Sequence, residues 1–321
     1  EGYLSETISE DIPICFLEKF NFVKQIVKKI SIKPNLIISG FKHYHDEIFK
    51  FWVAECKYKF KTKFIIMAHG KAHQKISGIF NFEENISDKK LIWSKKNLIK
   101  NLSFPKNILS LNGDIKKRGN VILSYVHYNA TPYPVRIQTG PTGENNVQID
   151  KNFKVLYENL DINIKKKFKF LPNDNFSKLQ ESKVKKIIDS KKIAKKLSLN
   201  EHLPKSKLVI CSYPQSALID SILSGPTILL CDYSMWEPIS EFSNIYVKMK
   251  KAGIFFDDPL KAAKHVNKHW ENIELWWSSR KIVKLKEEFL KTNNFSQKKT
   301  SFEKLKKWID FFNSEKDFKK A

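Results

Sequence analysis

The stretch LVICSYPQSALIDSILSGPTILLCD, residues 208–232, decides the fold class of this chain. LVIC and ILLCD are short apolar runs typical of buried strands, and ALIDSILS between them carries apolar residues at helical spacing. The sequence GPT breaks the helix before the second strand. Two parallel strands joined by a crossover helix form a βαβ unit, so the stretch predicts an α/β fold.

The turn SYPQS, which precedes the helix, is a candidate phosphate site. In βαβ units, ligands bind beyond the carboxyl ends of the strands, where the free N–H groups of a helix N-terminus attract anions. We therefore expect Ser212, Gln215 and Ser216 to contact the phosphate of a nucleotide donor. The alternative is a structural βαβ unit with ordinary helix caps.

The composition is that of a folded protein with more than one domain. The chain has 321 residues, of which 41% are hydrophobic. The sequence shows no apolar run of about 18 residues and no signal peptide. Its four cysteines lie far apart without a CxxC pair, which predicts reduced structural cysteines, no zinc site and a cytoplasmic location. The first residue is Glu rather than Met, so we expect that an N-terminal portion is missing.

The net charge of +24 comes mainly from lysine. Such a charge attracts nucleotides, nucleic acid or an anionic membrane surface. The abundance of Lys, Asn, Ile and Phe is also typical of a proteome encoded by an AT-rich genome, which offers an alternative explanation. Because the lysines are scattered through amphipathic segments, we do not expect nucleic acid as a partner.

Strands and helices alternate along the rest of the chain. Strands are predicted at 34–40, 63–70, 90–94, 107–113, 119–126, 162–170 and 245–249, and helices at 16–31, 45–59, 150–160 and throughout the region after Pro259. Residues 177–198 form a Lys-rich amphipathic segment. Two Rossmann-like α/β domains with a helical tail match the architecture called GT-B, in which the acceptor binds the N-terminal domain and the nucleotide binds the C-terminal one. On this match we place an N-terminal acceptor-side domain at residues 1–115, a nucleotide-sugar-binding domain at 116–275 and a helical segment at 276–321.

Two histidines follow a predicted strand of the first domain. In MAHGKAHQ, residues 67–74, His69 stands at the carboxyl end of the strand and Gly70 allows a tight turn. A histidine there can act as general base on an acceptor hydroxyl or face a phosphate as a cation, and His73 is a second candidate. The alternative is a loop histidine bonded to backbone carbonyls.

A polar loop follows the first strand of the second domain, at residues 125–143. His127, Asn129 and Arg136 are candidate ligands of a donor phosphate. Arginine is scarce in this chain, and its guanidinium binds phosphate or carboxylate through two hydrogen bonds. A solvated loop whose arginine packs on a tyrosine is the alternative.

Two carboxylates lie in CDYSMWEP, residues 231–238. Asp232 ends a strand and Glu237 precedes a proline, so either could hold the ribose or base of a nucleotide. Asp232 could equally cap the segment that follows. The chain contains no Asp-x-Asp pair and no glycine-rich Walker loop, so we expect no metal cofactor.

Several of these pieces together resemble a known family. FKFWVAECKYKFKTKFIIMAHG, ENISDKKLIWS, LPKSKLVICSYPQSALIDSILSGPTILLCD and KKAGIFFDDPLKAAKHVN occur in the order found in transferases of bacterial surface-carbohydrate loci, often those for nonulosonic acids. These transferases are distantly similar to capsule Kdo transferases and to CDP-glycerol glycerophosphotransferases. The resemblance covers roughly residues 45–290. In that family Gln usually precedes the His-Gly pair, whereas this chain has Ala68, and the usual acidic residue of the central helix corresponds here to Asp220.

The resemblance implies a GT-B glycosyltransferase that moves an acidic sugar from a CMP-linked donor onto a glycan or lipid-linked saccharide. Helix N-terminal amides, Arg136 and His127 would stabilise the departing phosphate. His69 would deprotonate the acceptor if the reaction inverts configuration and would serve in binding if it retains configuration. Lys-rich segments near 284–320 could contact the anionic inner membrane, or form a solvated tail. The competing functions are charge-driven nucleic-acid binding and a nucleotide-sugar epimerase or hydrolase.

Overall fold

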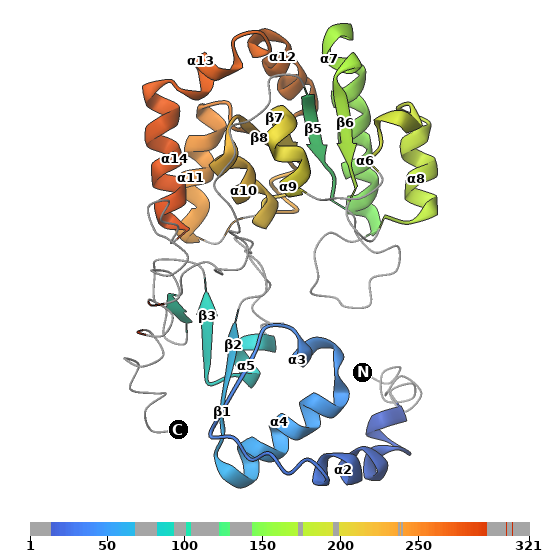
Figure 1. Ribbon diagram of the computed structural model, residues 1–321, viewed down its shortest axis with the longest axis vertical. Coiled ribbons are helices and arrows are strands. Elements are labelled where there is room, and N and C mark those ends of the chain that lie inside the picture. The colour runs from blue at the N-terminus through green and yellow to red at the C-terminus, as the bar shows by residue number, and fades with distance from the viewer. Residues whose placement is uncertain are drawn as a thin grey trace, which may run out of the picture. The chain divides into compact units, whose positions relative to one another are not determined.

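The structure, a computed structural model of the chain, describes residues 14–67, 82–92, 101–103, 122–128, 143–172, 176–194, 199–236, 238 and 240–293, with Lys306 and Asp310. The chain divides into two compact units, each with its own parallel sheet (Figure 1). The predicted α/β class with two Rossmann-like domains is confirmed. The predicted boundary between residues 115 and 116 lies outside the described residues.

The first unit alternates strands and helices. Its elements are η1 (Ile14–Phe16), α2 (Phe20–Lys28), β1 (Leu36–Ser39), α3 (Lys42–His45), α4 (Glu47–Phe60), β2 (Lys63–Met67), α5 (Phe82–Ile86), β3 (Lys89–Ile92) and β4 (Asn101–Ser103). The strands pair in the order β1-β2-β3-β4, all parallel. All the carboxyl ends therefore lie at one edge of this sheet. The strand predicted at 107–113 is outside the described residues.

Helix α4 covers one face of the first sheet. The side chain of Asp46 accepts a hydrogen bond from the Phe49 N–H at 2.9 Å and so caps the helix. Val53 and Cys56, three residues apart on the helix, are buried against Phe64 and Ile66, two residues apart on β2. In this small core, apolar residues at helical spacing on α4 pack against apolar residues at strand spacing on β2.

The second unit has the larger sheet. Its strands are β5 (Ile122–Val126), β6 (Phe168–Leu171), β7 (Ser206–Cys211), β8 (Thr227–Leu230) and β9 (Phe255–Phe256). Its helices are α6 (Gly143–Glu158), α7 (Ile162–Lys166), α8 (Lys178–Lys185), α9 (Leu199–His202), α10 (Ser216–Ser224), α11 (Ser240–Lys251), α12 (Pro259–His269), α13 (Ile273–Trp277) and α14 (Arg280–Thr292), with the 3-10 turns η4 (Ser190–Lys192) and η5 (Leu203–Lys205). The predicted βαβ unit at 208–232 is confirmed as β7, α10 and β8, with β7 and β8 parallel.

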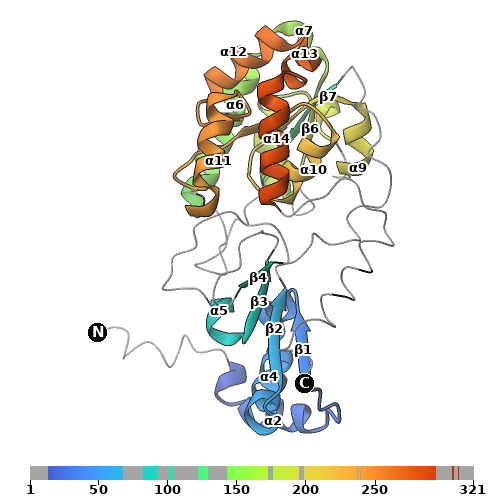
Figure 2. The same ribbon diagram turned by 90° about the vertical axis from the view of Figure 1, so that its left-hand side faces the viewer.

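Both faces of the second sheet are buried. Leu208 and Ile210 of β7 belong to a core shared with α6 and α12, whereas Val209 and Cys211 belong to a core shared with α10, α11 and α14. Figure 2 shows α11 and α14 side by side over one face. A strand buried on both faces needs a continuous apolar run, which explains the sequence LVIC.

The strand predicted at 245–249 is wrong, because these residues belong to helix α11. Ile245, Tyr246 and Met249 are buried at helical spacing, and this spacing overrides the strand propensity of the residues Ile-Tyr-Val. The strand predicted at 162–170 forms only from Phe168, because residues 162–166 make the single helical turn α7.

The first part of the helical segment predicted from residue 276, up to Asn293, packs into the core of the second unit. Trp277, Ile282 and Phe289 are buried in the core beneath α11. The apolar face of α14 is therefore used inside the protein. The membrane contact expected for segments near 284–320 stays a prediction. Residues 294–305 lie outside the described part of the chain.

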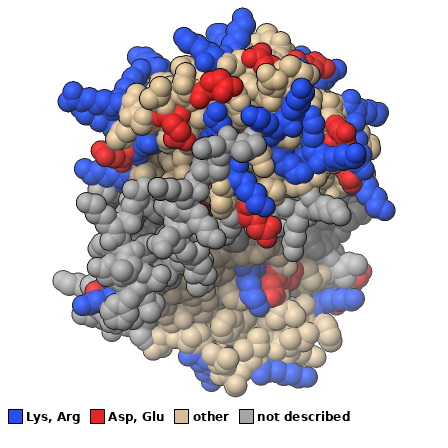
Figure 3. Space-filling view, turned by 45° about the horizontal axis from the view of Figure 1, so that its top comes forward, with Lys and Arg blue, Asp and Glu red and all other residues tan. Residues whose placement is uncertain are grey.

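In the view of Figure 3, lysine and arginine side chains are scattered among acidic and uncharged ones rather than gathered in one patch. Within the described residues, no helix combines the length and hydrophobicity that crossing a bilayer requires.

Candidate functional site

The strand order of the second sheet indicates a candidate ligand site. The order is β6-β5-β7-β8-β9, so the chain runs from β5 to one side and then returns to the other side at β7. In open α/β sheets, ligands bind beyond the carboxyl ends of the two strands that flank such a reversal. We call the residues that follow β5, β7 and β8 at this edge, namely His127, Tyr128, Ser212, Tyr213 and Trp236, the switch-point cluster.

Ser212 joins the two strands of the switch point. Its hydroxyl accepts a hydrogen bond from the Tyr128 N–H at 2.7 Å, and its own N–H donates to the Val126 carbonyl at 3.0 Å. The side chain is only 2% exposed. Ser212 lies where the sequence predicted it, but the contact it makes fixes the backbone of the loop after β5.

Three aromatic rings line this edge. Tyr128 packs edge-on against Tyr213, with 5.3 Å between ring centroids, and against Trp236, with 5.2 Å. Burial raises the pKa of both tyrosine hydroxyls, so they stay protonated and can donate hydrogen bonds. The indole Nε1 of Trp236 is buried and has no hydrogen-bond partner among the described residues.

His127 is the histidine of the cluster. It is 2% exposed, and its Nε2 lies 3.5 Å from Oδ1 of Asp150 on α6. The other carboxylate oxygen of Asp150 lies 3.9 Å from Nζ of Lys183. Nδ1 of His127 is buried without a hydrogen-bond partner in the described part of the protein. A buried polar atom without a partner is costly unless something else binds it.

Of the other predicted donor residues, Gln215 and Ser216 stand at the start of α10. Gln215 is the N-cap, and its side chain makes no capping hydrogen bond. The N–H groups of the first turn are those that the sequence assigned to phosphate.

Asp232 makes a local contact. Its Oδ1 accepts hydrogen bonds from the Ser234 N–H at 2.8 Å and from the Ser234 hydroxyl at 2.7 Å. This contact forms a turn, whereas the sequence offered ribose binding or a cap on the following segment. Ribose or base binding by Asp232 stays a prediction. His69, His73, Asn129, Arg136 and Glu237 lie outside the described residues.

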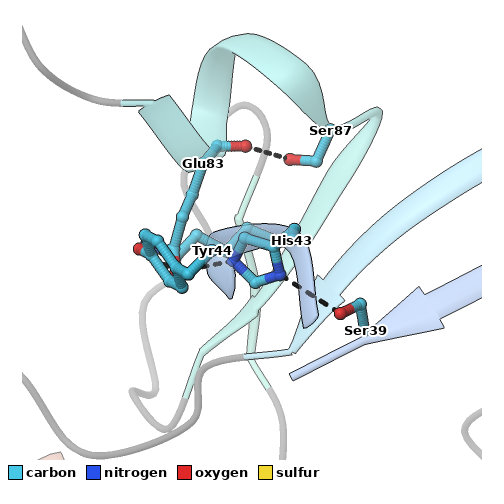
Figure 4. Close-up of polar contacts among 6 residues, drawn as sticks. Ser39, His43, Tyr44, Glu83 and Ser87 are labelled. Carbon is cyan, nitrogen blue, oxygen red and sulfur yellow. Dashed lines mark hydrogen bonds and ion pairs between the residues drawn. The ribbon is translucent and has the colours of Figure 1, made fainter. Parts of the chain in front are cut away.

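Sequence reasoning missed a polar cluster at the carboxyl edge of the first sheet. Ser39 ends β1, and its hydroxyl lies 3.2 Å from Nδ1 of His43 on α3. Nε2 of His43 lies 3.4 Å from Oε1 of Glu83 on α5, and the Tyr44 hydroxyl donates to the same oxygen at 2.6 Å. Figure 4 shows the ring of His43 between Ser39 and Glu83. Lys90 of β3 pairs with the second oxygen, Oε2.

The carboxylate of Glu83 stays ionised in this cluster. Burial alone raises its pKa, but the hydrogen bond from His43, the charge of Lys90 and the hydrogen bonds from Lys90 and Tyr44 together lower the pKa to about 2. The only hint of the cluster in the sequence is the Ser-Gly pair that ends the strand predicted at 34–40, the same context that drew attention to His69. Glu83 follows 44 residues after Ser39, and no local pattern links the two.

Within the described residues, no group of three or more histidine, cysteine, aspartate or glutamate side chains is arranged to hold a metal ion.

Comparison with known proteins identifies the family. The family model described as LIC12162 family transferase matches residues 1–312. A search of curated proteins finds no match.

Among solved structures, the crystal structure of TarM superposes with a TM-score of 0.51 at 12% identity over 91% of this chain and 58% of that chain. The chain thus spans somewhat more than half of the length of TarM. A mutant of S. aureus TarM, solved in complex with Fondaparinux, alpha-GlcNAc-glycerol and UDP, gives the same TM-score of 0.51 at 11% identity, again over 91% of this chain and 58% of that chain. A variant of the wall teichoic acid polymerase TagF covers 100% of this chain and 98% of its own length at 12% identity, with a TM-score of 0.45. The TarM match supports the GT-B type of fold predicted above.

Proposed function

The chain belongs to the LIC12162 transferase family, and on this premise we propose that it transfers a sugar from a nucleotide donor to a saccharide acceptor. More specifically, we propose a nonulosonic acid as the sugar, CMP as the donor's nucleotide and a bacterial surface glycan or glycoconjugate as the acceptor. The observation that carries the proposal is the switch-point cluster, in which His127 Nδ1 and Trp236 Nε1 are buried without partners among the described residues.

The chemistry of the cluster suits a nucleotide sugar. An indole N–H and tyrosine hydroxyls can bond sugar or base oxygens, and aromatic rings can cover their apolar faces. When protonated, His127 donates from both ring nitrogens, so Nδ1 can bond a phosphate oxygen while Nε2 keeps its contact with Asp150. The N–H groups in the first turn of α10 add a second anion site on the same edge.

The leaving group explains why these residues are needed. As the bond between the sugar and the phosphate breaks, the phosphate gains negative charge, and preorganised donors that face it lower the barrier. Arg136 and Asn129 are proposed as further donors, and Glu237 and Asp232 as ligands of the ribose or base. The high positive charge of the chain suits a donor that carries a carboxylate as well as a phosphate.

The acceptor is proposed to bind the first unit. His69, with His73 as second candidate, is proposed to deprotonate the acceptor hydroxyl or, if the reaction retains configuration, to bind the acceptor. We propose that transfer needs no metal, and undiminished activity in EDTA would support this.

Thermal shift with a panel of CMP-, UDP-, GDP- and CDP-sugars tests the donor. A ligand present at 100 times its dissociation constant stabilises the native state by about 2.7 kcal/mol, which is readily measured. We expect the largest shift with a CMP-sugar, and we expect Trp236→Phe and His127→Gln to reduce it. A larger shift with UDP-sugars would refute the CMP assignment, and no shift with any of these donors would refute the proposal.

A product assay separates transfer from the competing activities. Transfer requires an added acceptor, whereas an epimerase or hydrolase changes or releases the sugar without one. Rapid sugar release that is unaffected by saccharide acceptors would refute transfer.

A further inference from the structure

We propose that Ser39, His43 and Glu83 form a proton relay that activates the acceptor hydroxyl in the first unit. This inference rests on the transfer reaction proposed above. It replaces one assignment made there: His43 rather than His69 accepts the proton of the acceptor hydroxyl, and His69 binds the acceptor.

The hydrogen-bond geometry fixes the direction of the relay. The carboxylate of Glu83 is ionised and can only accept, so Nε2 of His43, at 3.4 Å, carries the hydrogen. In the neutral imidazole, Nδ1 then holds a lone pair, and the Ser39 hydroxyl at 3.2 Å donates to it. The order is hydroxyl, base and orienting carboxylate, which is the arrangement of an activated hydroxyl in many enzymes.

The surroundings hold this order in place. His43 is 1% exposed and lies against the rings of Phe64 and Phe82, with centroids 6.3 and 6.5 Å away. The charged and titratable groups of the cluster are Tyr44 on the same helix, Glu83 from α5 and Lys90 from β3. Because Tyr44 and Lys90 both bind Glu83, the carboxylate cannot turn away from the imidazole without losing two partners.

The position fits a substrate-binding role. Ser39 is the last residue of β1, at the sheet edge where α/β folds bind ligands. It is 6% exposed, more than the histidine behind it. The cluster also exceeds what a structural role requires, since a buried serine hydroxyl can be satisfied by a backbone carbonyl, as that of Ser87 is by the Glu83 carbonyl at 2.6 Å.

In the proposed step, proton transfer through Ser39 to His43 accompanies displacement of the donor phosphate. The acceptor hydroxyl gives its proton to Ser39 Oγ as the Ser39 proton passes to Nδ1 of His43. The acceptor oxygen then bonds the anomeric carbon of the sugar, and the bond from that carbon to the donor phosphate breaks with its electron pair on the phosphate. Glu83 remains ionised and stabilises the imidazolium, which later releases the proton to water.

Transfer kinetics across pH test the relay. Ser39→Ala and His43→Gln should each lower kcat/KM about 100-fold or more, the usual scale for the loss of a general base. His43→Gln should also remove the acidic limb of the pH profile. Glu83→Gln should shift that limb to lower pH, because the imidazolium loses the anion that faces it.

Two control variants sharpen the test. Ser87→Ala removes a hydroxyl from the same part of the unit that does not face His43, and it should leave kcat/KM and the pH profile unchanged. His69→Ala should raise KM and keep the acidic limb. Wild-type kcat/KM in either Ser39→Ala or His43→Gln would overturn the relay.

Nitrogen NMR of the histidines in the full chain gives a readout without substrate. We expect His43 in the Nε2–H tautomer, with an Nδ1 shift that changes in Ser39→Ala. The Nδ1–H tautomer would overturn the relay, because Ser39 could not then donate. If the wild-type protein transfers no sugar, the proposed function fails, and this measurement decides the relay independently.

Discussion

The carboxyl edges of the two sheets differ in how their buried polar groups are satisfied. In the first unit, Ser39, His43 and Glu83 bond one another in a chain. In the second, His127 and Trp236 each leave a buried nitrogen without a partner in the described part of the protein. An unpaired buried polar group costs about 1–3 kcal/mol, and such a cost is expected where a ligand supplies the missing bond.

The comparison suggests different tasks for the two edges. A continuous hydrogen-bond chain holds the donor and acceptor atoms in line before the reaction, which suits proton transfer. An edge with unpaired donors and aromatic rings suits recognition of a bound molecule. If the comparison is right, breaking hydrogen bonds at the first edge should cost stability, and changing the second edge should alter donor binding.

The largest effect on stability is expected for Glu83→Leu. The substitution leaves the ammonium of Lys90, which is only 13% exposed, without its partner. Breaking a buried ion pair on one side typically costs about 3–5 kcal/mol. Denaturant unfolding, monitored by hydrogen–deuterium exchange, should show the lower free energy of unfolding in the peptides of α4 and β2.

The double variant Glu83→Leu with Lys90→Met is the control for that prediction. It removes both charges, so most of the lost free energy of unfolding should return. A double variant no more stable than Glu83→Leu would show that the charge of Lys90 is not the cause.

Acid should destabilise the first unit through the same carboxylate. The pKa of Glu83 is lowered from 4.5 to about 2, so its contribution is present above pH 4.5 and disappears as the pH falls toward 2. The difference corresponds to about 3 kcal/mol at most. Acid titration, monitored by peptide-resolved hydrogen–deuterium exchange, should show the free energy of unfolding of the first unit falling with pH. The Glu83→Gln variant should show a weaker dependence on pH. An unchanged acid profile in Glu83→Gln would contradict the assignment.

Ser212→Ala tests the loop that supports the second edge. It removes the acceptor of the Tyr128 N–H bond and should lower the free energy of unfolding by about 1–3 kcal/mol. Ser234→Ala is the matched control on an exposed turn and should change stability by less than about 0.5 kcal/mol. Equal effects of the two substitutions in denaturant unfolding would show that Ser212 does not anchor the loop.

Local sequence patterns predicted the second unit well because its strands are buried on both faces. The predicted strands LVIC at 208–211 and ILLCD at 228–232 and the helix between them correspond to β7, β8 and α10. The strand prediction was wrong at 245–249, where β-branched and aromatic residues belong to an amphipathic helix. His127 and Ser212 became candidates because polar residues at strand ends are visible locally, and their part in donor binding stays a prediction.

The cluster at the first edge was not predictable in the same way. The partner of His43 is Glu83, 40 residues away, and the two meet only because β1 and β3 flank β2 in the folded sheet. The unpaired state of Trp236 Nε1 was equally invisible, since it depends on which groups do not reach it. Residue types and strand ends can be read from a sequence, whereas satisfaction of hydrogen bonds requires tertiary structure.

The smallest expected effect is that of Gln215→Asp, for which stability should rise while donor binding weakens. Gln215 precedes α10 without capping it, whereas Asp258 caps α12 by accepting from the Leu260 N–H at 2.8 Å. Gln215→Asp should stabilise the fold by about 0.5–1 kcal/mol as an N-cap and should weaken donor binding, because its carboxylate takes the N–H groups meant for phosphate. Asp258→Ala should lose about 1 kcal/mol and leave the donor-induced thermal shift unchanged. If Gln215→Asp raised both the melting temperature and the donor-induced shift, the start of α10 would not be an anion site, and the open character of the second edge would rest on His127 and Trp236 alone.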